Sequence, residues 1–343
     1  MSRRYRKDVE HFLSVVCMFK NESHIIKEWT EHYIKEGVDH FYLIDNGSTD
    51  SYLKEIENNF SNISIIHDSG SGIQTRIYSD WLKSSLIRSK WVLIVDMDEF
   101  VYAKNGFNTI KDFLKQKCES YNQIVVPMAI FTSNNHIQQP PSVIQGFTER
   151  LLMAPTTTRN LKNGRYGNFL ERAKTKAIVR VNDFPEDSKR SALLNFRHFY
   201  NTLTIGVHGS YVTGITISSD LKRTMNMVLE ENWIDKVDGS KVTAITILRE
   251  ASEEIFDDSY LLGNHYTVQS YDMFWSKLDR YRDHKSGAPK GGHSTHAYCG
   301  KSSCYYCADP EWYFQHQWDH ANVFPKNFIE DTRLPTKIYK DNV

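Results

Sequence analysis

The stretch Trp91-Val-Leu-Ile-Val-Asp96-Met97-Asp98-Glu99-Phe100 decides the fold that we expect. Its first five residues form the most apolar strand-like run in the chain, which is typical of a parallel strand covered on both faces. The run ends abruptly at two aspartates. Two carboxylates at the exit of a buried strand can turn toward one oxygen-preferring cation, such as Mn²⁺ or Mg²⁺. Glu99 is either a further ligand or a cap for neighbouring backbone, and the alternative for the whole motif is a pair of solvated turn aspartates.

Strands and helices alternate around this stretch. Three further strands are predicted by apolar runs, at 12–19, 41–44 and 63–67. Helical spacing at 25–34 has Asn21 as its expected cap and Gly37 as its expected stop, and a second helical stripe covers 73–82. The pattern predicts an α/β fold with a mostly parallel, doubly wound sheet, which binds ligands beyond the carboxyl ends of its strands.

The second strand leads into the polar turn Asp45-Asn-Gly-Ser-Thr-Asp50. Ser48 or Thr49 could cap the helix that follows, and a simple turn with a helix cap is one interpretation. The other is a ligand site, because an aspartate there can accept hydrogen bonds from a base imino group or ribose hydroxyls. Backbone N–H groups at a helix start also suit phosphate.

Beyond Pro127 the periodicity weakens. We predict a strand near 177–181 and helices near 220–230 and 271–282.

Composition excludes some classes of function. Lys plus Arg and Asp plus Glu both total 42, so a nucleic-acid partner is not expected. No apolar stretch approaches the roughly 18 residues that span a bilayer, and the run at 12–19 leads into Lys20 and not into a cleavage site. With five cysteines and no secretory signal, we expect a soluble, cytoplasmic protein without a transmembrane anchor.

The order and spacing of its motifs make the chain resemble glycosyltransferase families 2 and 92, which share the GT-A fold. The motifs that carry the resemblance are, in chain order, Lys20-Asn21-Glu22, Glu28-Trp29, His32-Tyr33, Gly37 to Tyr42, Asp45 to Asp50 and Asp96 to Phe100. It recurs at 146–150, at 176–178, and at Asn264-His265-Tyr266 followed by Ser270 and Lys277. No single motif is specific alone.

The resemblance implies roles for the matched residues. Asp96 and Asp98 would bind the metal, Asp45 would hold the nucleotide, and His265 would supply another metal ligand. The expected nucleotide-sugar-binding set is Lys20, Asn21, Glu22, Asp45, Gln74, Arg76, Asp96 and Met97. The alternative, purely structural interpretations are a hydrogen-bonded core histidine for His265 and a solvated helix start for Gln74 and Arg76. His208 is the next ligand candidate if His265 lies elsewhere.

The function that we expect is metal-dependent transfer of a sugar from a nucleotide-diphosphate donor, a UDP-sugar above all, to an acceptor hydroxyl. The acceptor could be a glycan, a glycolipid or a protein. The related families invert the anomeric centre, so a carboxylate should deprotonate the acceptor. Glu149 has the best family position for this base, and Glu171 and Asp183 are alternatives. A structural carboxylate paired with an arginine would look the same in the sequence.

Two other functions stay open. A strand ending in Asp-x-Asp also opens haloacid-dehalogenase-like phosphatases, in which the first aspartate is the nucleophile, although Glu99 and Phe100 fit that pattern poorly. A non-enzymatic, zinc-bearing interaction protein is the third hypothesis. It depends on a tail whose spacing fits no common zinc finger but that has enough ligands for structural Zn²⁺: His293, His296, Cys299, Cys304, Cys307, His316 and His320.

We therefore predict a GT-A domain over 9–283, with a donor-binding half at about 9–130 and an acceptor-side half at about 131–283. An extension rich in aromatic residues, cysteine and histidine follows at 284–343. The sequence does not predict the oligomeric state.

Overall fold

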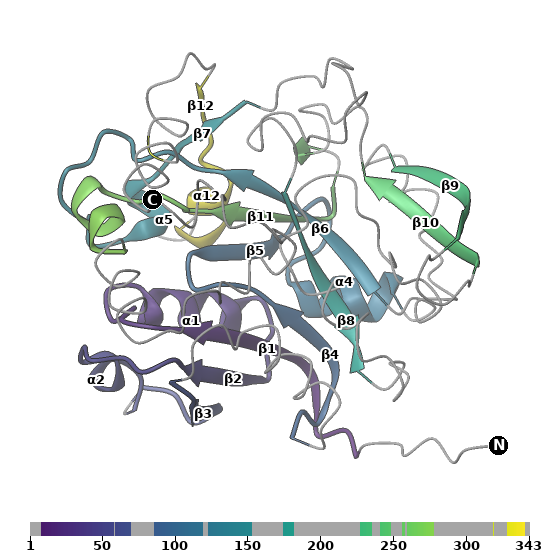
Figure 1. Cartoon of the computed structure of the whole chain (residues 1–343), viewed down its shortest axis with the longest axis horizontal. Helices are drawn as coiled ribbons and strands as arrows, with labels where there is room; N and C mark the ends of the chain where they lie inside the picture. The colour runs from purple at the N-terminus through teal and green to yellow at the C-terminus, as the bar shows by residue number, and fades with distance from the viewer. Residues whose placement is uncertain are drawn as a thin grey trace, which may run out of the picture.

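The computed structural model describes residues 8–57, 59–69, 86–118, 123–152, 174–181, 227–234, 241–247, 256–257, 259–277, 318 and 328–339. Eight strands form one sheet: β1 (His11–Phe19), β2 (His40–Asp45), β3 (Ile63–His67), β4 (Ser89–Ile94), β5 (Glu99–Ala103), β6 (Gln123–Ile130), β8 (Lys174–Arg180) and β11 (Leu261–His265). The labelled helices are α1 (Ile26–Lys35), α2 (Tyr52–Ile56), α4 (Ile110–Lys117), α5 (Val143–Gly146) and α12 (Arg333–Tyr339) (Figure 1), and residues 271–277 are also helical.

The sheet has the order β3-β2-β1-β4-β8-β6-β11-β5. Strands β1 to β4, β6 and β11 run in one direction, and only β8 and β5 run against them. The predicted α/β class with a mostly parallel sheet is therefore confirmed. Because β1, β2, β3, β4, β6 and β11 end at the same edge, the loops that follow them share one side of the molecule.

Two short antiparallel pairs accompany the sheet. One joins β9 (Met227–Ile234) to β10 (Lys241–Ile247), and the other joins β7 (Glu149–Leu151) to β12 (Phe328–Glu330). The helix predicted near 220–230 is wrong from residue 227 onward, where the chain is a strand because pairing with β10 outweighs a weak local helical pattern. The helix predicted near 271–282 is confirmed over its described part, 271–277. The helix expected at 73–82 lies outside the described residues.

Apolar side chains of the central strands cover both faces of the sheet. Val15 and Leu93 belong to the main core, whereas Val16 and Ile94 belong to a smaller cluster. Since successive strand residues point to opposite faces, the two clusters lie on opposite sides of the sheet. Helix α1 buries Trp29 and Tyr33 completely in the main core, beside β1 and β5 (Figure 1).

The predicted helix caps are wrong, and the stop is right. Asn21 has a φ of +55° and its side-chain oxygen accepts hydrogen bonds from the N–H groups of Thr49 (2.7 Å) and Asp50 (3.3 Å), so it ties two loops together and does not cap α1. Neither Ser48 nor Thr49 caps α2, whose N-cap position is Ser51. Gly37 has a φ of +85° just beyond α1, a conformation that glycine adopts without strain.

The end of the chain packs onto this domain. Strand β12 pairs with β7, and Leu334 of α12 is fully buried in the main core. Asp331 forms an ion pair with Arg150 (2.5 Å). Residues 328–339 are thus part of the body formed by the sheet, and the boundary near residue 283 stays a prediction.

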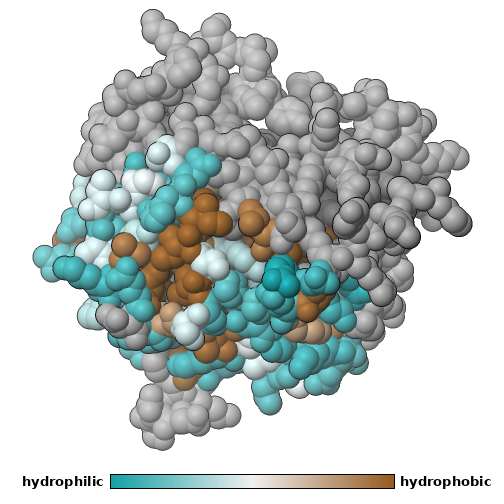
Figure 2. Space-filling view, turned by 90° about the horizontal axis from the view of Figure 1, so that it is seen from below, coloured by the Kyte–Doolittle hydropathy of each residue, from teal (hydrophilic) through white to brown (hydrophobic). Residues whose placement is uncertain are grey.

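Among the described residues, none of the helices combines the length and the apolar character needed to cross a membrane. Seen from below, the described surface carries a band of apolar residues between hydrophilic margins (Figure 2).

Candidate active site

The acidic turn, Asp96 to Glu99, connects β4 to β5 and is supported by side chains of α1. The indole N–H of Trp29 donates to the backbone oxygens of Asp96 (3.2 Å) and Glu99 (3.1 Å). The hydroxyl of Tyr33 also donates to the backbone oxygen of Glu99 (2.9 Å). Both rings are fully buried, so the turn rests on rigid supports. Buried carbonyls that accept hydrogen bonds in this way fix the backbone from which the carboxylates project.

Glu99 caps this turn, which is one of the two roles predicted for it. Its Oε2 accepts a hydrogen bond from the backbone N–H of Asp96 (2.9 Å) and lies 2.8 Å from Nζ of Lys176. The side chain is completely buried. Glu99 therefore faces into the protein, while Asp96 and Asp98 retain side-chain exposures of 23% and 18%.

The structure brings His265 to the same turn. His265 ends β11, where it pairs with Glu99 of β5 on one side and Ile130 of β6 on the other. Its Nε2 lies 3.5 Å from Oδ1 of Asp98, and its Nδ1 lies 3.7 Å from Oε1 of Glu99. The backbone N–H of Tyr266 donates to the backbone oxygen of Asp98 (2.9 Å), and this hydrogen bond links the end of β11 to the turn.

Asp98, Glu99 and His265 form a group that suits a divalent cation. One ligand atom from each lies within 4.8 Å of the others. Ligands on opposite sides of an ion bound at roughly 2.1 Å lie about 4.2 Å apart, so a small closure would bring such atoms into coordination. Carboxylate oxygens with one imidazole nitrogen match the preferences of Mn²⁺ and related ions.

Two lysines neutralise these carboxylates. Nζ of Lys176, on β8, lies 3.0 Å from Oδ2 of Asp96 and is almost fully buried. Burial lowers the pKa of Lys176, but the attraction of Asp96 and Glu99 is larger and raises it overall, so the side chain stays charged. Nζ of Lys277 lies 3.0 Å from Oδ2 of Asp98. Burial raises the pKa of Asp98, but Lys277 and His265 outweigh it and hold that pKa well below its usual range.

Asp45 lies at the same edge of the sheet, at the end of β2. Its Oδ1 accepts the N–H of Ser48 (2.7 Å), and its Oδ2 accepts the hydroxyl of Tyr52 (3.1 Å) and lies 3.0 Å from Nδ1 of His67. Burial acts to raise the pKa of Asp45, but hydrogen bonds from Ser48, His67 and Tyr52 lower it overall. The side chain of Asp45 is 6% exposed and that of His67 is 69% exposed, so His67 is the member of this pair that lies at the surface.

The residues expected to follow β1 have structural partners. The backbone N–H of Asn21 donates to Ser48 Oγ (3.0 Å), and the Asn21 side chain holds the neighbouring turn, as described above. Oε2 of Glu22 lies 3.8 Å from Nε2 of His24. Lys20 is half-buried at the end of β1. The side chain of Met97 is 3% exposed and belongs to the main core, so only its backbone could touch a donor.

Glu149, the candidate base, begins β7 beside the end of β6. Its Oε2 accepts a hydrogen bond from Thr132 Oγ1 (3.1 Å), and its backbone oxygen accepts one from the Thr132 N–H (2.9 Å). Thr132 follows Phe131, whose N–H donates to the backbone oxygen of His265 (3.0 Å). Glu149 is therefore hydrogen-bonded to Thr132, which lies two residues beyond the end of β6, the strand whose last residue pairs with His265.

Several predicted site residues lie outside the described part of the chain. They are Gln74, Arg76, the alternative bases Glu171 and Asp183, the alternative ligand His208, and the cysteines and histidines between His293 and His320. The structure does not test the predicted zinc site.

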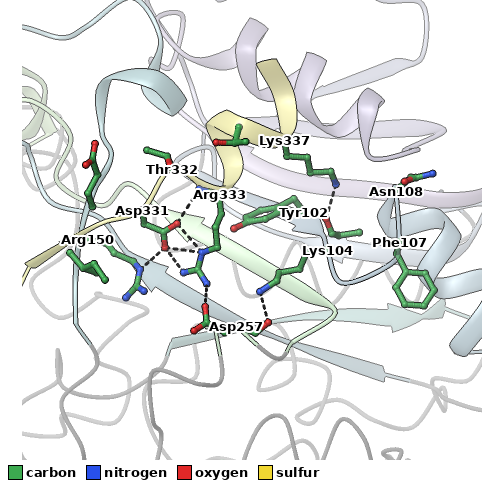
Figure 3. A pocket seen from close by; sticks show the side chains of 14 residues that line it. Tyr102, Lys104, Phe107, Asn108, Arg150, Asp257, Asp331, Thr332, Arg333 and Lys337 are labelled. Atoms are coloured by element: carbon green, nitrogen blue, oxygen red, sulfur yellow. Dashed lines mark hydrogen bonds and ion pairs between the residues drawn. The ribbon is translucent and has the colours of Figure 1, made fainter. Parts of the chain in front are cut away.

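A cavity of about 900 Å³ lies at the other end of β5. It is lined by Tyr102, Asp331 and Arg333 among others, and Asp331 pairs there with Arg150 and Arg333 (Figure 3). Glu99 and Ala103 bound β5, so about 13 Å of strand separates this cavity from the acidic turn. Arg150, Arg333 and Lys337 form ion pairs that connect the segment of α12 to the domain, and we do not assign this cavity to the active site.

Sequence reasoning missed Lys176, Lys277 and His67 as members of this site. Lys176 and Lys277 stood within stretches that carried the family resemblance, but nothing in their local sequence pairs them with Asp96 and Asp98. For His67 a signal existed, because it ends the strand after Asp45 and parallel strands in register bring such ends together.

The model of glycosyltransferase family 92 matches residues 72–238. This range contains Asp96, Asp98, Glu149 and Lys176, whereas Asp45 and His265 lie outside it.

Two curated proteins are similar to part of the chain. A glycosyltransferase family 92 protein of Ricinus communis is 25% identical over 130 residues, which cover 35% of this chain and 22% of that protein. A glycosyltransferase family 92 protein of Oryza sativa subsp. japonica is 28% identical over 116 residues, covering 31% of this chain and 18% of that protein. The match thus spans about a fifth of the length of each relative.

Solved structures give weaker likenesses. Glucosyl-3-phosphoglycerate synthase from Mycobacterium tuberculosis, in complex with Mn²⁺, uridine diphosphate and glucosyl-3-phosphoglycerate, is 15% identical with a TM-score of 0.24 and covers 35% of this chain and 44% of its own. A 4-diphosphocytidyl-2C-methyl-D-erythritol synthase from Anaerococcus prevotii is 14% identical with a TM-score of 0.28, and the match covers 50% of this chain and 71% of that protein. TM-scores of this size leave the family match and the curated relatives as the grounds for the relationship. On those grounds, the resemblance of this chain to glycosyltransferase family 92 is confirmed.

Proposed function

We propose that this chain is a metal-dependent glycosyltransferase that takes its sugar from a nucleotide-diphosphate donor. The observation that carries the proposal is the meeting of His265 with the acidic turn at the carboxyl edge of the sheet, 3.5 Å from Asp98. Ligand sites of open α/β sheets lie at this edge. The family match and the chemistry of the donor atoms support the same assignment.

Asp98 and Nε2 of His265 are the proposed metal ligands, with Asp96 on the same turn as a further candidate. Oε1 of Glu99 lies 3.7 Å from Nδ1 of His265, whereas Asp98 approaches the other ring nitrogen, Nε2. A carboxylate on the second ring nitrogen orients a ligating histidine and fixes its tautomer, so we assign Glu99 this positioning role. A bound Mn²⁺ or Mg²⁺ would neutralise the charge that develops on the departing diphosphate.

Asp45 and His67 are proposed to face the nucleoside together. In the tautomer that donates from Nδ1 to Asp45 Oδ2 at 3.0 Å, Nε2 of His67 is an acceptor. Such an acceptor can receive a ribose hydroxyl or the imino N–H of a uracil ring, which supports a UDP-sugar as the donor. Asp45 then acts mainly through His67 and not by direct contact.

Glu149 remains the proposed general base for an inverting transfer. Its carboxylate is half-buried beside Thr132, close to the strand end that touches His265. The acceptor, whether glycan, glycolipid or protein, would approach from this side of the edge.

A screen of nucleotide sugars tests the proposal. We expect one donor to be hydrolysed or transferred in the presence of Mn²⁺ or Mg²⁺, to be inert in excess chelator, and to be inert with Asp98→Asn. Glu31→Gln, which changes an exposed carboxylate on α1, should keep full activity. Turnover that persists without any divalent cation contradicts the proposal, and hydrolysis of a phosphate monoester instead would favour the phosphatase alternative.

A further inference from the structure

We propose that Lys277 is an exchangeable counter-cation, which holds Asp98 in the metal-free protein and turns to the donor's diphosphate when a divalent cation binds. The inference rests on the proposed function, since it assumes that Asp98 is a metal ligand and that a diphosphate binds beside it. It adds a residue that contacts the donor and couples donor binding to metal binding.

The geometry places Lys277 in competition with a cation. Nζ of Lys277 lies 3.0 Å from Oδ2 of Asp98 and donates to the backbone oxygen of Thr267 (3.2 Å). The other oxygen of Asp98 faces Nε2 of His265 at 3.5 Å. Asp98 thus contacts the ammonium of Lys277 through Oδ2, while its Oδ1 faces the position beside His265 that a divalent cation would take.

Electrostatics make the two occupants exclude each other. A divalent ion coordinated by Asp98 would lie within a few ångströms of the ammonium, and repulsion at that distance is strong in a partly buried site. It would also withdraw the negative charge that holds Lys277 in place. The side chains of Lys277 and Asp98 are 20% and 18% exposed, so both are partly open to solvent.

Lys277 can turn without a change in the fold. The helix over 271–277 is fixed at its start, where Ser270 Oγ accepts the N–H of Met273 (3.3 Å). The four-carbon stem of lysine rotates freely beyond such a support. A diphosphate that meets the cation at Asp98 would arrive within reach of the released ammonium, which is a natural partner for phosphate oxygens.

Lys176 has a different role, although it also contacts this acidic turn. Its side chain is 3% exposed and its Nζ lies between Asp96 Oδ2 (3.0 Å) and Glu99 Oε2 (2.8 Å). Two partners and deep burial keep it in place as part of the scaffold. Within the described part of the chain, Lys277 therefore has one carboxylate partner, Asp98, and the partial exposure that exchange requires.

The test compares wild-type protein with Lys277→Gln in Mn²⁺ titrations followed by electron paramagnetic resonance, with and without uridine diphosphate. We expect Lys277→Gln to bind Mn²⁺ alone at least threefold more tightly, because its competitor is gone. The same variant should bind uridine diphosphate in the presence of saturating Mn²⁺ at least tenfold more weakly. Lys277→Arg, which keeps the charge, should restore both values toward wild type.

A matched control is Lys111→Gln. Lys111 also pairs with one carboxylate, Asp39, at a side-chain exposure of 25%, but at the other end of the sheet, where Asp39 accepts the N–H groups of Phe12 and Leu13. This variant should leave both affinities unchanged.

Unchanged or weaker Mn²⁺ binding by Lys277→Gln would overturn the inference, as would tighter Mn²⁺ binding with unchanged affinity for uridine diphosphate. If Lys277→Gln loses its fold by circular dichroism, Lys277→Met and Lys277→Arg provide the same comparison of neutral and charged side chains. The outcome is separate from the proposed function, because a chain that turns over no nucleotide sugar can still be titrated with Mn²⁺.

Discussion

Nε2 of His265 lies 3.5 Å from Oδ1 of Asp98, so the end of β11 meets the turn that follows β4. Two segments that are far apart in the chain thereby share one chemical site. The carboxyl-terminal half of the chain contributes a ligand-type group to an edge built mostly by the amino-terminal half.

His265→Ala should raise the Mn²⁺ concentration needed for half-maximal activity by at least tenfold, because it removes a nitrogen ligand. The measurement is donor turnover against Mn²⁺ concentration. His11→Ala, at the start of β1, is the control, and an unchanged metal requirement in His265→Ala would remove this residue from the metal centre.

Asp96→Ala and Asp98→Ala should both abolish turnover but differ in stability. Asp96→Ala leaves buried Lys176 with Glu99 as its carboxylate partner, and we expect a loss of about 1–3 kcal/mol in the free energy of unfolding. Asp98→Ala leaves Lys277, whose side chain is 20% exposed and can turn to water, so its loss should stay below about 1 kcal/mol. Urea unfolding measures both. Equal losses would mean that the two lysines are held alike.

His67→Ala should weaken the binding of uridine diphosphate by about 1 kcal/mol, the usual contribution of one hydrogen bond. The reason is the His67 side chain, which is 69% exposed and which Asp45 orients at the edge of the sheet. Isothermal titration calorimetry provides the affinity, and His40→Ala, at the other end of β2, is the control. An affinity that is lost equally in both variants would show a general effect on the paired strands β2 and β3 and not a nucleoside contact.

The sequence predicts the four amino-terminal strands well, because each is a compact apolar run between polar turns. It places Asp45 and Asp96 correctly at strand ends for the same reason. The caps failed because Asn21 and Ser48 have their strongest partners in each other's loops, which only the paired ends of β1 and β2 bring together. The support of the acidic turn by Trp29 and Tyr33 was likewise hidden, since an apolar helix stripe does not show that its polar ring atoms reach two carbonyls.

Asp331→Asn should destabilise the protein by about 3 kcal/mol at neutral pH, because it removes the ion pair with Arg150, whose side chain is 4% exposed. Burial alone would raise the pKa of Asp331, but Arg333 and Arg150 outweigh it and lower that pKa below its ordinary value. A depressed pKa gives stability that is present above the unfolded pKa, roughly 3.9, and is lost as pH falls through the folded value. The gap between wild type and variant should therefore be widest above about pH 4 and narrow in stronger acid. A constant gap in urea unfolding across this range would contradict the assignment.

The central claim, a divalent cation held by the acidic turn and β11, is tested most directly by anomalous diffraction from crystals grown with Mn²⁺ and uridine diphosphate. We predict an anomalous peak at roughly 2.1–2.3 Å from a carboxylate oxygen of Asp98 and from Nε2 of His265, in contact with the diphosphate. Lys277 Nζ should lie away from Asp98 in that crystal. A peak elsewhere, or a bound diphosphate with no metal at Asp98 and His265, would contradict the account.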